Sequence, residues 1–216
     1  MKQVKLNLSD KNQIEKIAET AAGIFKKGGV VIYPTDTLYG LGANALDEDA
    51  ILKIYKIKKR DRNKPLSIIA KDLKMAKKIA CVDSRVEKIL NKIWPGPITV
   101  RLRKKDIVPY ILAGNGETIA VRIPDNEFIS ILMNKIDFPI TATSANISGE
   151  KNLLKTIEII SEFKSAELKP DLFINAGNVK NPKPSTIVDL TTGVPKVLRV
   201  GIVGREEMKK FFDKFI

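Results

Sequence analysis

Two periodicities alternate along the chain, and each predicts one kind of element. Short apolar or alternating stretches are typical of strands, and they occur at residues 4–8, 30–33, 66–70, 98–103, 118–123, 139–143, 171–175, 187–190 and 195–199. Stretches with apolar residues three or four positions apart are typical of amphipathic helices, and they occur at about residues 10–27, 48–57, 72–79, 84–93, 125–134, 153–163 and 205–215. Because strands and helices alternate, the sequence predicts an α/β fold.

The pattern continues without an internal repeat, a low-complexity segment or a linker. We therefore expect a single domain over residues 1–216, with its core at about 10–200 and a C-terminal helix at about 204–215. Apolar residues make up 44% of the chain, which is enough to build a hydrophobic core. Neither a membrane-spanning apolar run nor the apolar segment of a signal peptide is found, so we expect a cytoplasmic protein without membrane contact.

The composition excludes several kinds of chemistry. The chain has no histidine and one cysteine, Cys81, so neither a disulfide framework nor the usual histidine or cysteine metal sites can form. General acid–base catalysis by histidine is excluded for the same reason. We expect Cys81 to be a small buried apolar side chain and Trp94, in a proline-rich turn, to serve packing. Any metal is expected to be a hard cation, held by carboxylates or by substrate phosphates.

The net charge of +13 favours association with an anionic partner, and nucleic acid is one candidate. Many of the lysines, however, lie on predicted helix faces that water can solvate, as in residues 71–78. Charge alone therefore leaves both interpretations open.

Three polar loops follow or precede predicted strands, at residues 34–37, 143–146 and 184–186. Their small hydroxyl and amide groups can bind carboxylates and phosphates without introducing a competing base. The first loop continues into a Gly-rich stretch at 40–42, whose glycines we expect to leave room for a ligand. Cationic side chains able to hold an anion are Lys58, Arg60, Arg62, Lys64, Arg122 and Arg199. From the residues alone, this pattern predicts an anion- or nucleotide-binding α/β enzyme.

Each of these residues also has a structural interpretation. Thr35 and Thr37 can cap a turn, and Ser144 and Asn146 can form an Asx turn. The cations can be satisfied without a ligand, with Lys58 and Arg60 at a solvated helix end, Arg122 in an ion pair and Arg199 on an edge strand. Taken singly, the residues do not decide between the two interpretations.

Four motifs, taken together and in this order, resemble those of the YrdC-like threonylcarbamoyl-AMP synthases: residues 34–42, Lys58-Lys59-Arg60, Ser144-Ala145-Asn146 and residues 184–189. The resemblance covers about residues 10–200. It implies a twisted mixed α/β sheet with flanking helices and a large concave, positively charged cavity. The implied reaction joins L-threonine, bicarbonate or CO2 and ATP into threonylcarbamoyl-AMP and releases pyrophosphate. A partner transferase then moves the threonylcarbamoyl group to an adenosine of tRNA, and tRNA itself is a further candidate partner.

The resemblance also implies roles for individual residues. L-Threonine is expected to contact Thr37, Arg122 and Ser185. ATP is expected to contact a larger set, which comprises Lys58, Arg60, Lys64, Thr118, Ser144, Asn146, Asn152 and Arg199. Mg²⁺ is expected to enter on the ATP phosphates, and no residue is expected to act as a nucleophile. Catalysis then depends on positioning and on charge neutralisation.

The chain departs from the family pattern in the strand that follows the basic loop, and again after Arg199, where it reads Val200-Gly201 in place of the common Pro-Gly. Some family members carry a histidine close after the strand that follows the basic loop, where this chain reads Leu66-Ser67-Ile68-Ile69. Two alternative functions are a non-enzymatic module that binds double-stranded RNA or tRNA, and a carbamoylating role like that of hydrogenase-maturation proteins. Aromatic residues make up only 6% of the chain, which counts against base stacking, and the zinc-binding cysteines of the hydrogenase-maturation proteins are absent.

Overall fold

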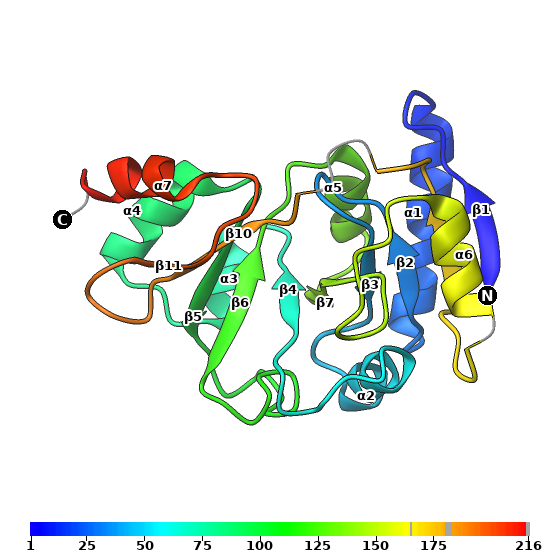
Figure 1. Cartoon of the computed structure of the whole chain (residues 1–216), viewed down its shortest axis with the longest axis horizontal. Helices are drawn as coiled ribbons and strands as arrows, with labels where there is room; N and C mark the ends of the chain where they lie inside the picture. The colour runs from blue at the N-terminus through cyan, green and yellow to red at the C-terminus, as the bar shows by residue number, and fades with distance from the viewer. Residues whose placement is uncertain (165, 180–182, 215–216) are drawn as a thin grey trace.

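A computed structural model describes residues 1–164, 166–179 and 183–214, and its strands form two mixed sheets (Figure 1). The five-stranded sheet contains, in spatial order, β1 (Lys2–Lys5), β9 (Leu172–Asn175), β2 (Val31–Tyr33), β3 (Gly40–Gly42) and β8 (Thr143–Ser144). The six-stranded sheet contains β11 (Lys196–Arg199), β10 (Thr186–Asp189), β5 (Ile98–Arg103), β6 (Thr118–Arg122), β4 (Ser67–Ile69) and β7 (Ile140–Thr141). The predicted α/β class is confirmed, and the single mixed sheet is corrected to two.

The helices of the described residues are α1 (Lys11–Lys26), α2 (Glu48–Ile57), α3 (Leu73–Ile79), α4 (Ser84–Ile93), α5 (Glu127–Asn134), α6 (Thr156–Lys164) and α7 (Arg205–Phe212). Each of the first five begins at a side-chain cap that accepts a hydrogen bond from the backbone N–H three residues on, and the caps are Asp10, Asp47, Asp72, Asp83 and Asn126. In Figure 1, α1 and α6 lie with the five-stranded sheet, and α4 and α7 lie with the six-stranded sheet at the opposite end of the molecule. Residue 215, the expected end of the last helix, lies outside the described residues.

The Gly-rich stretch after β2 is itself a strand, which the sequence pattern did not indicate. β3 pairs antiparallel with β2 and places Gly40 and Gly42 against the buried ring of Tyr33. A Cβ atom at Gly42 would lie 2.5 Å from this ring, and one at Gly40 would lie 2.8 Å from it. These glycines therefore make room for Tyr33, and since Gly40 also lines the cavity described below, the expectation that they leave room for a ligand stays a prediction.

The expected strand at 139–143 divides into two short strands that belong to different sheets. β7 pairs with β4 in the six-stranded sheet, and β8 pairs with β3 in the five-stranded sheet. Between them, the backbone N–H of Ala142 donates to the carbonyl of Ser67 at 2.7 Å. This crossing segment joins the two sheets beside the cavity described below.

The buried apolar side chains form a cluster that includes residues of both sheets. Trp94 is buried within it and donates a hydrogen bond to the carbonyl of Ile98, which confirms its packing role. Cys81 is exposed, which corrects its expected burial. It follows buried Ala80 in extended backbone, where successive side chains point to opposite sides. In the described part of the chain, no helix has both the length and the apolar character needed to span a membrane.

Candidate functional site

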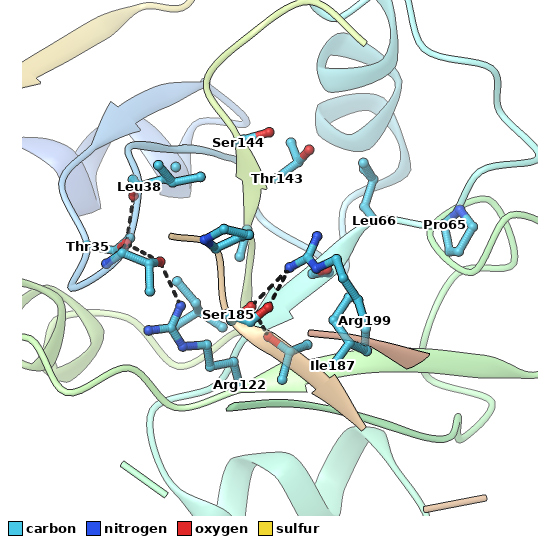
Figure 2. A pocket seen from close by; sticks show the side chains of 18 of the residues that line it. Thr35, Leu38, Pro65, Leu66, Arg122, Thr143, Ser144, Ser185, Ile187 and Arg199 are labelled. Atoms are coloured by element: carbon cyan, nitrogen blue, oxygen red, sulfur yellow. Dashed lines mark hydrogen bonds between the residues drawn. The ribbon is translucent and has the colours of Figure 1, made fainter. Parts of the chain in front are cut away.

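A cavity of about 650 Å³ lies between the two sheets and is lined by residues of both. Figure 2 shows side chains from the loop after β2, from β8 and from β10 and β11 around this space. Among the described residues that line it, the charged side chains are four arginines, Arg60, Arg101, Arg122 and Arg199. Such a lining suits a ligand with more than one anionic group.

The floor of the cavity is one face of the six-stranded sheet. Alternate residues of neighbouring strands line the cavity, and they are Ser67, Ile69, Thr99, Arg101, Ala120, Arg122 and Ile187. The residues between them, Ile68, Val100 and Val121, are buried in the core on the other face. Because strand side chains alternate between faces, each strand contributes to the core and to the cavity at once.

Arg122, at the end of β6, is the most enclosed cation of the floor, with 7% of its surface exposed. Its Nε donates to the carbonyl of Gly96 at 2.9 Å, its Nη1 donates to Thr37 Oγ1 at 3.0 Å, and its Nη2 donates to Asp36. Burial lowers the pKa of the Arg122 guanidinium below its usual value, and the adjacent Asp36 carboxylate opposes this shift. Arg122 and Asp36 therefore form the ion pair that the structural interpretation of Arg122 predicted. This ion pair lies in the wall of the cavity.

The two threonines of the loop after β2 have different roles (Figure 2). Thr35 Oγ1 donates to the carbonyl of Leu38 at 2.6 Å and accepts from the backbone N–H of Thr37, so Thr35 caps the turn. Thr37 Oγ1 instead accepts from Arg122 and lies 3.2 Å from Thr35 Oγ1. The turn thus holds the Thr37 hydroxyl against the guanidinium in the cavity.

Ser185, just before β10, joins two further cavity residues. Its hydroxyl lies 2.8 Å from Thr99 Oγ1, and Arg199 Nη2 donates to its carbonyl at 2.8 Å and to its hydroxyl at 3.3 Å (Figure 2). Burial lowers the pKa of the Arg199 guanidinium. These hydrogen bonds hold the side chain of Arg199, which belongs to the edge strand β11, over the face of the sheet that lines the cavity.

Arg60 borders the cavity from the basic loop after α2. Its guanidinium donates to the carbonyls of Lys64 and Pro65 at 3.2 and 2.9 Å, and to Ser148 Oγ at 3.4 Å. These contacts fix a half-buried cation at the rim, and burial lowers its pKa. The Lys64 side chain itself is exposed and does not line the cavity.

Lys58 holds a loop in place. The residue has only 1% of its surface exposed. Its ammonium donates hydrogen bonds to the carbonyls of Ser144 and Asn146 at 2.6 Å each and to Asn146 Oδ1 at 3.2 Å. Asn146 Oδ1 also accepts from Ser144 Oγ at 2.7 Å. Burial, and secondarily the charge of Arg60, lowers the pKa of Lys58 to about 7, whereas the three accepting oxygens favour the protonated form. Lys58 thus connects the end of α2 to the loop that carries Ser144.

The structure brings together seven of the predicted site residues as cavity lining: Thr37, Arg60, Arg122, Ser144, Asn152, Ser185 and Arg199. Four others, Lys58, Lys64, Thr118 and Asn146, do not line it, and the ligand contacts of both groups stay predictions. Sequence reasoning missed Asp36, Thr99 and Arg101. Thr99 and Arg101 had a signal, because both are polar positions in the alternating strand Ile98–Arg103.

Comparison with known proteins places this geometry in a family. The sequence profile named Sua5_yciO_yrdC, with the description "Telomere recombination", matches residues 23–201. A Pyrococcus abyssi protein named threonylcarbamoyl-AMP synthase is 36% identical over 191 residues, which are 88% of this chain and 55% of that protein. A Methanocaldococcus jannaschii relative is 37% identical over 207 residues, 96% of each chain. The chain thus spans about half the length of the first relative and nearly all of the second.

A solved structure supports the same assignment at the level of the fold. The crystal structure of P. abyssi Sua5 complexed with L-threonine has a TM-score of 0.85 and 34% sequence identity, and the match covers 97% of this chain and 59% of that one. The profile match extends over most of the chain and includes the cavity residues from Thr37 to Arg199. The chain therefore belongs to the Sua5/YciO/YrdC family.

Proposed function

We propose that this protein is an L-threonylcarbamoyladenylate synthase, which makes threonylcarbamoyl-AMP and pyrophosphate from L-threonine, bicarbonate or CO2, and ATP. The observation that carries the proposal is the Arg122–Thr37 contact inside a cavity whose described lining includes four arginines. The name of the P. abyssi relative and the threonine complex of P. abyssi Sua5 support it.

L-Threonine is proposed to bind with its carboxylate at Arg122. A guanidinium has five N–H donors, and three of those of Arg122 are used within the protein, one on each nitrogen. One N–H therefore remains on each terminal nitrogen, which suits two-point binding of a carboxylate. Thr37 and Ser185 supply hydroxyls on either side, and the loop after β2 forms the wall of this half of the cavity.

ATP is proposed to occupy the other half, where Arg60, Arg199, Ser144 and Asn152 line the cavity. The threonine amine adds to CO2 and releases a proton to solvent, which gives a carbamate, and a carbamate oxygen attacks the α-phosphorus of ATP. The bond from that phosphorus to the bridging oxygen breaks, and pyrophosphate leaves. The reaction needs no protein nucleophile, because the carbamate is the nucleophile. Positioning and neutralisation of phosphate charge supply the catalysis.

The residues of the cavity fit a metal that enters with the nucleotide. Its described lining includes hydroxyls and arginines, and in the described chain no three His, Cys, Asp or Glu side chains form a metal-binding group. Mg²⁺ bound to the ATP phosphates would neutralise charge on them, and Arg60 and Arg199 would hold oxygens that the metal leaves free.

The product is proposed to be used outside this cavity. Threonylcarbamoyl-AMP is a mixed anhydride, so it can transfer its acyl group to an amine. We propose a partner transferase that moves the threonylcarbamoyl group to an adenosine of tRNA.

Pyrophosphate release tests the proposal directly. The expected result is release that requires ATP, bicarbonate and L-threonine together, and that falls to background when L-threonine is omitted. Calorimetry with L-threonine, with and without a non-hydrolysable ATP analogue, should show binding that L-serine does not match. No pyrophosphate release with all three substrates and Mg²⁺ present would overturn the proposal.

A further inference from the structure

Arg101 is a cavity residue without a role in the reaction proposed above. It lies on β5, two residues after Thr99, and lines the cavity on the same face of the six-stranded sheet. Its side chain is 42% exposed, so the charged group is neither in the core nor free in bulk solvent. Its Nε, however, is buried, and a buried N–H that water does not reach needs a partner, either from the protein or from a ligand.

The protein satisfies Arg101 poorly. Its Nε is buried and has no hydrogen-bond partner in the described residues. The nearest carboxylate, Asp189 Oδ2, is 3.6 Å from Nε, which is beyond hydrogen-bond distance. The other oxygen of Asp189 accepts instead from the backbone N–H and the hydroxyl of Thr191, at 2.9 and 2.6 Å. Asp189 therefore balances the charge of Arg101 without saturating its donors.

The neighbouring strands leave space beside this guanidinium. The strand register places Asp189, Arg101, Ala120 and Ser67 in one row across β10, β5, β6 and β4. Three of these residues, Arg101, Ala120 and Ser67, line the cavity. Since Ala120 carries only a methyl group, the floor is open between a guanidinium on one side and a hydroxyl on the other.

We propose that Arg101, Ala120 and Ser67 form a phosphate subsite that holds the nucleotide during the proposed reaction. The inference rests on the proposed function. Arg122 lies two residues after Ala120 on β6, and two residues of a strand span about 7 Å. In the adenylate, only a few bonds separate the threonine carboxylate from the α-phosphorus, so a carboxylate at Arg122 brings the phosphates to the neighbouring row. There the five-donor fork of Arg101 would hold non-bridging phosphate oxygens.

The competing interpretation is a purely structural ion pair between Arg101 and Asp189. A structural pair predicts that replacing Arg101 lowers thermal stability and leaves the affinities for ATP and L-threonine in their normal ratio. The phosphate subsite predicts a loss confined to the nucleotide. The two interpretations therefore differ in a measurable ratio and not only in total activity.

Calorimetry on Arg101→Ala and Arg101→Lys, with a non-hydrolysable ATP analogue and with L-threonine, tests the subsite. We expect Arg101→Ala to lower the affinity for the ATP analogue by about ten- to a hundredfold, which is the range for the loss of charge-assisted hydrogen bonds. The affinity for L-threonine should stay unchanged. Arg101→Lys should lose less, because an ammonium keeps the charge but not the fork. The matched control is Arg103→Ala, an exposed arginine two residues further along the same strand that does not line the cavity.

Each result of this experiment decides something. Unchanged affinity for the ATP analogue in Arg101→Ala would overturn the subsite while leaving the proposed function intact. An equal loss of both ligands, or an equal loss in Arg103→Ala, would also overturn it, since both indicate a general structural effect. If the unmodified protein bound neither ligand, the proposed function would fail first, and the subsite with it.

Discussion

At the scale of single residues, the cavity depends on cations that the protein has already oriented. Arg122 is held at all three of its nitrogens, and Arg199 and Arg60 each donate to backbone carbonyls and to a serine hydroxyl. A cation fixed in this way loses little conformational freedom when an anion binds. This is why the rigid fork of arginine suits these positions better than the flexible stem of lysine.

Replacing Arg122 by lysine tests this argument. A lysine ammonium cannot contact Gly96, Thr37 and Asp36 while also presenting two parallel donors to a carboxylate. We expect Arg122→Lys to lower the affinity for L-threonine by about ten- to a hundredfold, as measured by calorimetry, and to change the affinity for an ATP analogue much less. Arg103→Lys is the control, because Arg103 is an exposed arginine that does not line the cavity. An unchanged threonine affinity in Arg122→Lys would contradict the assignment of the carboxylate.

Tyr39 gives the protein a predictable sensitivity to alkaline pH. Its hydroxyl donates to the carbonyl of Gly177 at 2.7 Å and accepts from the backbone N–H of Ala176 at 2.9 Å. Burial raises the pKa of Tyr39 to about 12, above its usual value of 10. Between these two values the unfolded chain releases the proton and the folded protein keeps it, so the free energy of unfolding falls as pH rises.

Urea unfolding at several pH values checks this prediction. We expect Tyr39→Phe to cost about 1–3 kcal/mol at neutral pH, because the hydroxyl's two hydrogen bonds, to the carbonyl of Gly177 and from the N–H of Ala176, are lost. The same variant should lose less stability than the unmodified protein between pH 10 and 12. Tyr110→Phe, at an exposed tyrosine, should change neither the free energy of unfolding at neutral pH nor its dependence on pH. An identical pH dependence in Tyr39→Phe would show that this hydroxyl is not responsible.

At the scale of elements, β3 shows how packing can replace a local strand signal. Two of its three residues are glycines, which weaken a strand because they lose more backbone conformational entropy on folding and have no side chain to pack. β3 forms nevertheless, because the Tyr33 ring fills the space that side chains would occupy and its hydroxyl donates to the carbonyl of Thr141 at 2.7 Å. A close ring contact across the strand pair thus specifies an element that propensity would reject.

Two glycine-to-alanine substitutions should therefore have opposite signs. Gly42→Ala would place a methyl group 2.5 Å from the Tyr33 ring and 3.0 Å from the carbonyl of Thr141, so we expect a loss of about 1–3 kcal/mol. Gly23→Ala, inside α1 and with no atom within 4 Å of the added methyl, should gain about 0.5–1 kcal/mol. Chemical unfolding measures both. A gain at Gly42 would show that β3 can move away from the ring.

The element boundaries follow largely from the sequence. The apolar spacing predicted α1 to α5 to within a few residues, because an amphipathic face is a local property. The expected strand at 139–143 was placed correctly but assigned to one element, whereas it divides between two sheets. Its division depends on the partners β3 and β4, which lie far away along the chain.

At the scale of the whole molecule, part of the positive charge gathers away from the cavity. Lys26, Lys71, Lys74 and Lys78 border a surface concavity of about 590 Å³ formed by the end of α1, α3 and residues 134–137. In the described part of the chain, none of these four is ion-paired with an acidic side chain. If tRNA contacts this protein, as the alternative function requires, this surface offers cations that lie outside the cavity of the proposed reaction.

The salt dependence of tRNA binding tests whether this surface contacts RNA. We expect replacement of these four lysines by glutamine to lower the slope of log affinity against log salt by about 3, and to leave threonine-dependent pyrophosphate release unchanged. A set of four exposed lysines elsewhere, Lys2, Lys5, Lys209 and Lys210, is the control. An unchanged slope would show that this concavity does not meet the RNA.

The sequence by itself determined the fold class, the order of most elements, the absence of histidine and disulfide chemistry, and the family. These properties depend on local periodicity, on composition and on short motifs, which need no knowledge of what packs against what. The tertiary structure decided which polar residues face one another. Thr37 meets Arg122 and Lys58 meets Asn146, pairs that are 85 and 88 positions apart. Only the folded chain brings such distant pairs together, and only the folded sheet places Arg101 in the wall of the cavity.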